Sequence, residues 1–174
     1  RMSDIVHQCR GAVTWIHAHA GDYGIDPDQI FISGHSAGGH LTAMLAATNW
    51  QTFSGAPEDL IKGGIALSGI YDLTPVQHSY MQETLALTDE ELANYSPQFF
   101  ETAPSIPLIV APGSAESDAF RHQSANLVNA WNAKGANCEY MEPAGCNHFS
   151  ILAEFANPDS TLTQASIQLI KRNL

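Results

Sequence analysis

A stretch near the start of the chain combines a short apolar run, a glycine turn and a run of small residues. Residues 29–32 favour a strand, and Gly34-His35-Ser36-Ala37-Gly38 follows almost directly. This segment fits G-x-S-x-G, the nucleophile-elbow pattern, in which a serine occupies a sharp, strained turn between a strand and a helix (the elbow). Glycines at Gly34 and Gly38 are expected to let the strand and the helix approach without Cβ clashes. The pattern predicts that Ser36 projects above a sheet, at the start of a helix over residues 37–47.

Apolar runs and helical periodicity alternate along the rest of the chain. This alternation predicts an α/β fold, with a mostly parallel sheet and helices on both faces. Residues 1–174 are expected to form one domain, with a cap-like insertion at about 74–100 that contains helices near 80–87 and 89–94. Residues 49–59 are predicted to be a loop. The other expected helices are 2–19, 118–134 (opened by Ser117 or Asp118) and 162–171, and the other expected strands are 61–70, 106–111 and 138–141.

The charge of the chain argues against two classes of partner. The net charge is −11, with only seven lysines and arginines, which are scattered. Nucleic acids and anionic membranes both attract clustered basic residues, so neither is expected as a partner. No apolar run approaches the roughly 20 residues of a membrane span. Cys9, Cys138 and Cys146 match no zinc pattern, and their use as plain thiols favours a reducing, cytoplasmic location.

A serine hydroxyl becomes a good nucleophile only when a base removes its proton and an acid orients that base. In this arrangement the chain order is serine, acid, histidine. His148 is the best candidate base, because it lies in a loop after the last predicted strand. Glu116 and Asp118 both follow the strand at 106–111. Position alone favours Glu116, whereas Asp118 is well placed to cap a helix.

Four segments follow one another along the chain: Gly34 to Leu41, Leu67 to Leu73, Glu116 to Ser124 and Asn147 to Phe149. In this order they resemble the kynurenine formamidase (arylformamidase) group of esterase/lipase-like α/β-hydrolases. In the third segment, the acidic residue of this group stands four positions before a phenylalanine, which here is Phe120. By resemblance the acid is therefore Glu116. Better-known members usually carry Asp at this position. The fold that the resemblance implies is the α/β-hydrolase fold.

The resemblance implies a serine hydrolase of a small-molecule ester or amide that needs no cofactor and no metal. Its expected substrate is N-formylkynurenine or another arylformamide. A short-chain carboxylesterase is the alternative, and a non-catalytic hydrolase-like binding module is an alternative of another class. The backbone N–H of Ala37 is expected to stabilise the oxyanion. His35, Tyr71 and Phe149 are the candidates to line the substrate pocket.

The chain resembles the C-terminal part of such enzymes. Family members carry a His-Gly-Gly segment before the elbow that supplies part of the oxyanion hole, and this chain shows none. The N-terminal strands of the fold are therefore expected to be absent, which leaves an unpaired sheet edge at residues 30–32. Such an edge favours a homodimer, or pairing with an N-terminal segment.

Overall fold

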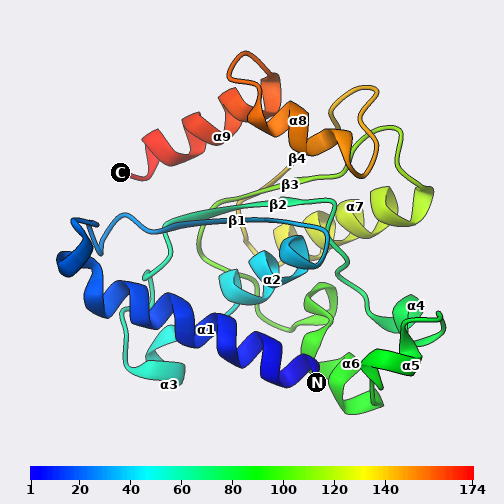
Figure 1. The fold of residues 1–174 in the computed structure, drawn as a ribbon, viewed down its shortest axis with the longest axis horizontal. Helices are drawn as coiled ribbons and strands as arrows, with labels where there is room; N and C mark the ends of the chain where they lie inside the picture. The colour runs from blue at the N-terminus through cyan, green and yellow to red at the C-terminus, as the bar shows by residue number, and fades with distance from the viewer.

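The computed structural model describes residues 1–174 and contains one four-stranded parallel sheet in the order β1-β2-β3-β4 (Figure 1). Each strand therefore pairs with the next strand along the chain. In register, His35 lies opposite Leu67 at the carboxyl ends of β1 and β2. The strands are β1 (Phe31–His35), β2 (Gly63–Leu67), β3 (Leu108–Ala111) and β4 (Cys138–Tyr140).

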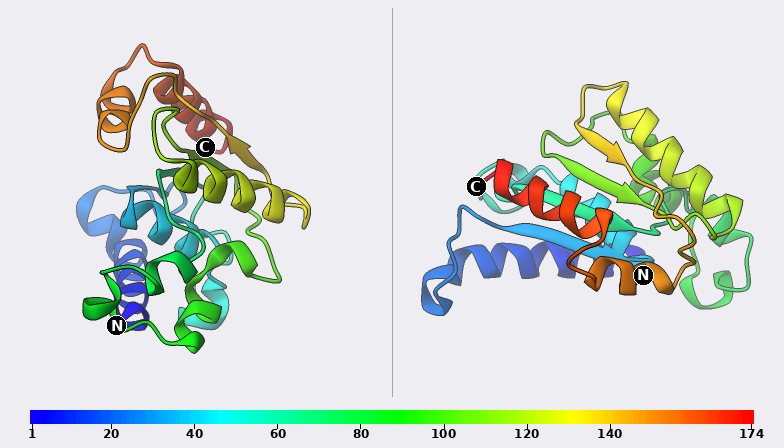
Figure 2. Two further views of the ribbon diagram at one scale, coloured as in Figure 1. Left: turned by 90° about the vertical axis from the view of Figure 1, so that its right-hand side faces the viewer. Right: turned by 90° about the horizontal axis from the view of Figure 1, so that it is seen from above.

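The side chains of the central strands alternate between two apolar layers. In β2, Ile65 and Leu67 face one layer and Ala66 the other, and β2 and β3 are buried throughout. This alternation follows from the period of two residues in a strand. One layer is filled by α1 (Met2–His19), α2 (Ala37–Ala46), α3 (Trp50–Ser54) and α7 (Asp118–Asn132), and the other by α8 (Ser150–Ala156) and α9 (Thr161–Arg172) (Figures 1 and 2).

The structure confirms the predicted parallel α/β architecture with helices on both faces of the sheet. Several details differ from expectation. Residues 49–59 are not all loop, because Asn49 accepts a hydrogen bond from the Thr52 N–H at 2.8 Å and caps the short helix α3. The strand predicted over 61–70 ends at Leu67, because Ser68 adopts φ of 48° and turns the chain out of the sheet.

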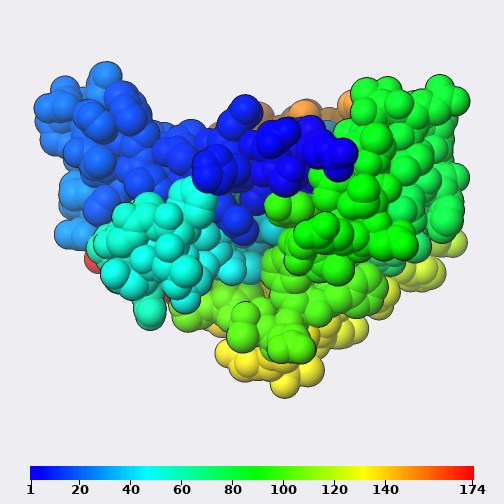
Figure 3. Space-filling model, turned by 90° about the horizontal axis from the view of Figure 1, so that it is seen from below, coloured from blue at the N-terminus to red at the C-terminus, as the bar shows by residue number.

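The segment 74–100 folds over the end of α1. It contains α4 (Thr74–Gln77), α5 (Gln82–Leu85), α6 (Asp89–Tyr95) and the 3₁₀ turn η2 (Pro97–Phe99). Another 3₁₀ turn, η1 (Ala20–Tyr23), directly follows α1 at its other end. The helix expected over 80–87 is thus shorter than predicted, whereas the one at 89–94 is present. Arg1 lies 3.8 Å from the carboxylate of Glu91, and Figure 3 shows the first turn of α1 against this segment.

β1 forms one edge of the sheet, since it pairs only with β2. Phe31 and Ile32 are half-buried and Ser33 is exposed. The structure therefore contains the unpaired edge expected at residues 30–32. None of the helices combines the length and the apolar character that crossing a bilayer requires.

A buried histidine ties α2 to α6. His40 is 4% exposed, and its Nε2–H donates to the carbonyl oxygen of Tyr95 at 2.8 Å. Burial lowers the pKa of His40 below its ordinary value of 6.5, although the hydrogen bond to Tyr95 acts in the opposite direction. Because the folded state binds this proton less readily than the unfolded state, the neutral side chain is favoured in the folded protein.

We therefore expect stability to be complete above pH 6.5 and to fall as the pH drops below it. The contribution of His40 is at most about 1.4 kcal/mol per pH unit. Urea unfolding of the wild type and of His40→Gln, at pH 7 and pH 5.5, measures this dependence. The same substitution at exposed His78 is the control. An equal loss of stability in wild type and His40→Gln would contradict the prediction.

Candidate active site

Ser36 lies at the tip of the strand-to-helix turn between β1 and α2, in a strained conformation. Its φ of 56° and ψ of −117° lie in a region that side-chain-bearing residues rarely adopt. Its hydroxyl makes no capping hydrogen bond to α2, so Ser36 is not an ordinary helix cap. The side chain is thereby held clear of the helix that follows it.

Two glycines allow the tight approach of strand and helix. A Cβ atom at Gly34 would lie 2.2 Å from the Gly38 carbonyl oxygen, and one at Gly39 would lie 2.6 Å from that of Leu67. A Cβ at Gly38 would contact nothing within 4 Å. Gly34 is therefore needed for the close approach, as expected. The second position at which a Cβ would clash is Gly39 and not Gly38.

The structure brings Ser36, His148 and Glu116 into one line. The Ser36 hydroxyl lies 3.1 Å from Nε2 of His148, and Nδ1 of His148 lies 3.4 Å from Oε2 of Glu116. Asp118 is not part of this line, because it is exposed at the start of α7 and pairs there with Arg121. Of the two candidate acids, the structure places only Glu116 beside the histidine.

Glu116 is held in place by two donors from neighbouring strand ends. Its Oε1 accepts hydrogen bonds from the hydroxyl of Ser68 and, at 3.1 Å, from the N–H of Gly113. Its side chain is fully buried. Oε2 is left facing His148, so the carboxylate has one anchored oxygen and one directed at the imidazole.

The loop that carries Glu116 and the loop that carries His148 are joined by hydrogen bonds. The Ala115 N–H donates to the Cys146 carbonyl at 2.9 Å, and the Gly145 N–H donates to the Ser114 hydroxyl at 2.7 Å. A Cβ at Gly113 would lie 2.2 Å from the Cys146 oxygen, so only glycine permits this approach. The two loops therefore form one support for the Glu116–His148 contact.

His35 holds the histidine loop to the elbow strand. Its Nε2–H donates to the main-chain oxygen of His148 at 2.6 Å, and the two imidazole centres are 4.6 Å apart. On the other side, the ring of Phe120 also lies 4.6 Å from that of His148. His148 is thus clamped between a residue of β1 and a residue of α7.

We expect His35→Leu to lower kcat of any Ser36-dependent reaction by about 10- to 100-fold, because small displacements of a catalytic base are costly. KM should change little, since the substrate contacts remain. His35→Gln keeps an N–H donor and should recover part of the lost rate. Steady-state kinetics of both variants measure the effect. Equal losses in both, carried mainly by KM, would exclude a positioning role.

The three residues expected to line the substrate pocket differ in where the structure places them. Phe149 is 77% exposed next to His148, where a substrate could contact it. His35 is engaged with the histidine loop. Tyr71 cannot line a pocket, because its ring is fully buried in the apolar layer beneath the sheet, and this burial raises the pKa of its hydroxyl.

Sequence reasoning assigned no role to Ser68 or Phe120. Ser68 directly follows β2 as Glu116 follows β3, and the carboxyl ends of neighbouring parallel strands meet at one edge. That relation could have indicated Ser68 as the partner of the acid. Phe120 lies in the segment that carries the family resemblance.

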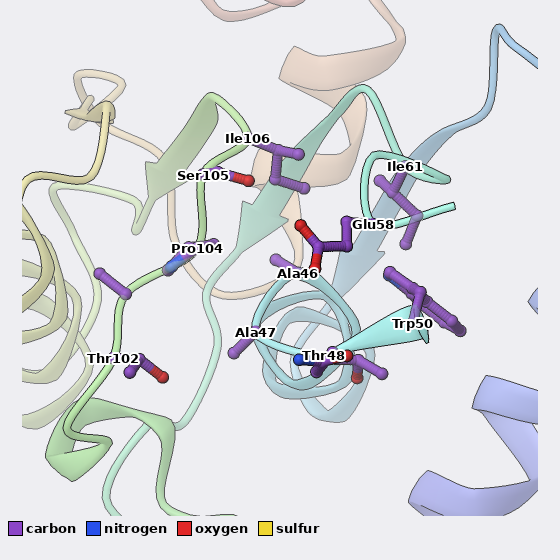
Figure 4. Close-up of a pocket in the computed structure, with 12 residues that line it drawn as sticks. Ala46, Ala47, Thr48, Trp50, Glu58, Ile61, Thr102, Pro104, Ser105 and Ile106 are labelled. Atoms are coloured by element: carbon purple, nitrogen blue, oxygen red, sulfur yellow. The ribbon is translucent and has the colours of Figure 1, made fainter. Parts of the chain in front are cut away.

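A separate hollow of about 260 Å³ lies at the opposite end of the sheet (Figure 4). Its lining includes Ile61 and Ile106, which precede β2 and β3, so it is remote from Ser36. No group of three or more His, Cys, Asp or Glu side chains is arranged to hold a metal ion.

The parallel sheet, the strained serine and the order serine, acid, histidine define an α/β-hydrolase fold. A crystal structure of a proposed thioesterase from Silicibacter sp. TM1040 superposes with a TM-score of 0.76, at 29% identity over 94% of this chain and 58% of that one. Residues 1–131 match the model of the BD-FAE family, and the chain belongs to that family.

Two curated relatives are kynurenine formamidases of fish. The chain is 32% identical to that of Danio rerio over 149 residues, and 31% identical to that of Salmo salar over 150 residues. Each match covers 83% of this chain but 50% of the relative. The chain thus spans about half the length of these relatives.

Proposed function

We propose that this chain carries the catalytic centre of a serine hydrolase, with Ser36 as nucleophile, His148 as base and Glu116 as the acid that orients it. The observation that carries the proposal is the line from Ser36 Oγ through the His148 imidazole to Glu116, with contacts of 3.1 and 3.4 Å. The longer contact fits a resting site, since catalytic hydrogen bonds often shorten only with substrate bound.

The reaction proceeds in two acyl-transfer steps. His148 Nε2 takes the proton of Ser36 as Oγ attacks the carbonyl carbon, and Glu116 stabilises the imidazolium that forms. His148 then donates the proton to the leaving nitrogen or oxygen, which leaves an ester on Ser36. Water, deprotonated by His148, cleaves this ester and restores the serine.

The oxyanion of each tetrahedral intermediate needs a donor near Ser36. Ala37 is the first residue of α2. Its N–H therefore has no carbonyl oxygen of a preceding helical turn to which it could donate. The positive end of the helix dipole lies at the same place. Ala37 N–H is therefore the donor that we assign to the oxyanion.

The proposed substrate is an arylformamide, with N-formylkynurenine as the leading candidate. Hydrolysis would release the aryl amine and formate. The kynurenine formamidase relatives support this choice, as do the aromatic rings of Phe120 and Phe149 beside His148. The alternative substrate class is a short-chain carboxylic ester.

A side-by-side assay of N-formylkynurenine and p-nitrophenyl acetate on the full chain tests the proposal. We expect Ser36-dependent turnover of both, with the higher kcat/KM for the formamide. A higher kcat/KM for the ester would replace the arylformamide with the esterase alternative. Binding of either compound without any turnover would indicate the non-catalytic binding module instead.

A further inference from the structure

The segment that follows β2 contacts both halves of the proposed catalytic centre. On one side, the Leu67 carbonyl oxygen accepts a hydrogen bond from the Ser36 N–H at 2.9 Å. On the other side, the Ser68 hydroxyl donates to Oε1 of Glu116. Ser68 adopts φ of 48°, a conformation that costs free energy unless its surroundings impose it. Whatever imposes this turn therefore acts on the nucleophile and on the acid together.

Close packing encloses the same segment from two directions. A Cβ atom at Gly39 would lie 2.9 Å from the Cα of Gly69, so the start of α2 rests on the segment. A Cβ at Gly69 would lie 2.4 Å from the hydroxyl oxygen of Tyr71, which is fully buried. The chain has left the sheet at this point, so the backbone N–H groups of Tyr71 and Asp72 must find acceptors outside the strand ladder.

One side chain of α7 provides that acceptor. Oε1 of Gln123 accepts hydrogen bonds from the Tyr71 N–H at 2.7 Å and from the Asp72 N–H at 2.9 Å. Gln123 is half-buried and lies one turn after Phe120, whose ring is 4.6 Å from that of His148. The same stretch of α7 therefore contacts the histidine directly and holds the segment after β2.

We propose that Gln123 is a positioning residue that, by holding this segment, keeps Ser68 in its strained turn and Glu116 directed at His148. The inference deepens the proposed function and rests on it. Without the Gln123 oxygen, two neighbouring backbone donors would lose their partner, and the turn at Ser68 would relax toward an ordinary conformation. Oε1 of Glu116 would then lose a donor, and Oε2 would no longer be held toward the imidazole. Gln123 thus acts on the rate of proton transfer and not on substrate binding.

The first test is steady-state kinetics with p-nitrophenyl acetate on the full chain. Gln123→Leu, which is similar in size but has no acceptor, should lower kcat by about 10- to 100-fold with little change in KM. Gln123→Glu keeps an oxygen for both N–H groups and should recover most of the lost rate. Gln8→Leu, the same substitution at an exposed position of α1, is the matched control and should behave as wild type.

Two further measurements separate a positioning role from a merely structural one. Ser68→Ala should also lower kcat, and combining it with Gln123→Leu should cost no more than the larger single loss, because both act through one hydrogen bond. The downfield proton resonance of His148 Nδ1, which faces Oε2 of Glu116, reports that contact without turnover. It should persist in Gln123→Glu and disappear in Gln123→Leu.

Wild-type kcat in a Gln123→Leu variant that is folded by circular dichroism, or losses that multiply in the double variant, would overturn the positioning role and leave the proposed function intact. If Gln123→Leu does not fold, Gln123→Asn, whose amide is one methylene too short to reach both donors, replaces it. Absence of Ser36-dependent turnover in the wild type would reject the proposed function instead. The resonance alone then decides: its loss in Gln123→Leu and return in Gln123→Glu support the role of Gln123, and any other result rejects it.

Discussion

Ser36→Ala is expected to lower kcat/KM for p-nitrophenyl acetate by roughly 10⁴- to 10⁶-fold. The substitution removes the only hydroxyl that lies within hydrogen-bonding distance of His148 Nε2. It leaves the strained turn and its neighbours in place, so the fold should persist. Initial rates at pH 7.5 and circular dichroism measure the two properties.

Ser33→Ala is the matched control, because Ser33 is exposed on β1 three residues before the elbow. A fluorophosphonate, which adds covalently to an activated serine, provides a second measurement that does not depend on turnover. Intact mass should show one adduct on wild type and on Ser33→Ala, and none on Ser36→Ala. Undiminished hydrolysis by Ser36→Ala would contradict the assignment of Ser36 as the nucleophile.

Glu116→Gln is expected to lower kcat by about 10³- to 10⁴-fold, because an amide cannot stabilise the imidazolium that forms on His148. Asp118→Asn should change kcat by less than about twofold. Its carboxylate is 74% exposed and is paired with Arg121 on the surface, where ion pairs contribute little. Steady-state kinetics of the two variants, at equal protein concentration, separate the two candidate acids.

Glu116→Asp refines the same comparison. The shorter side chain retains the charge, but it cannot keep both the contact with Ser68 and the contact with His148 at their present lengths. Its kcat should therefore lie between those of wild type and Glu116→Gln. A larger loss in Asp118→Asn than in Glu116→Gln would reverse the assignment of the acid.

The general architecture could be predicted because it depends on local patterns. Continuous apolar runs at 61–70 and 106–111 indicated buried strands, and both belong to the centre of the parallel sheet. Helical periodicity located α1 and α7 to within a few residues. The short helix α3 was missed, since five residues are too few to show a helical period.

The candidate site was predictable only in part, for a different reason. Chain order singled out Ser36 and His148, since each follows a strand and parallel strands bring their carboxyl ends together. Position along the chain favoured Glu116 but did not exclude Asp118, which is two residues away in the sequence. Nor did it show that Tyr71 turns inward, because a single aromatic residue after a strand fits a pocket wall and a core equally well.

The sequence by itself determined the parallel α/β fold, the strained turn at Ser36 and the set of residues from which a catalytic centre could be assembled. Only the tertiary structure decided which carboxylate faces His148 and that Ser68, Gly113 and His35 hold the arrangement in place. The physical reason is that periodicity and glycine sterics act within a few residues of the chain. The direction of a side chain at a strand end depends instead on hydrogen bonds from segments 32 to 113 residues away, which form only when the sheet is assembled.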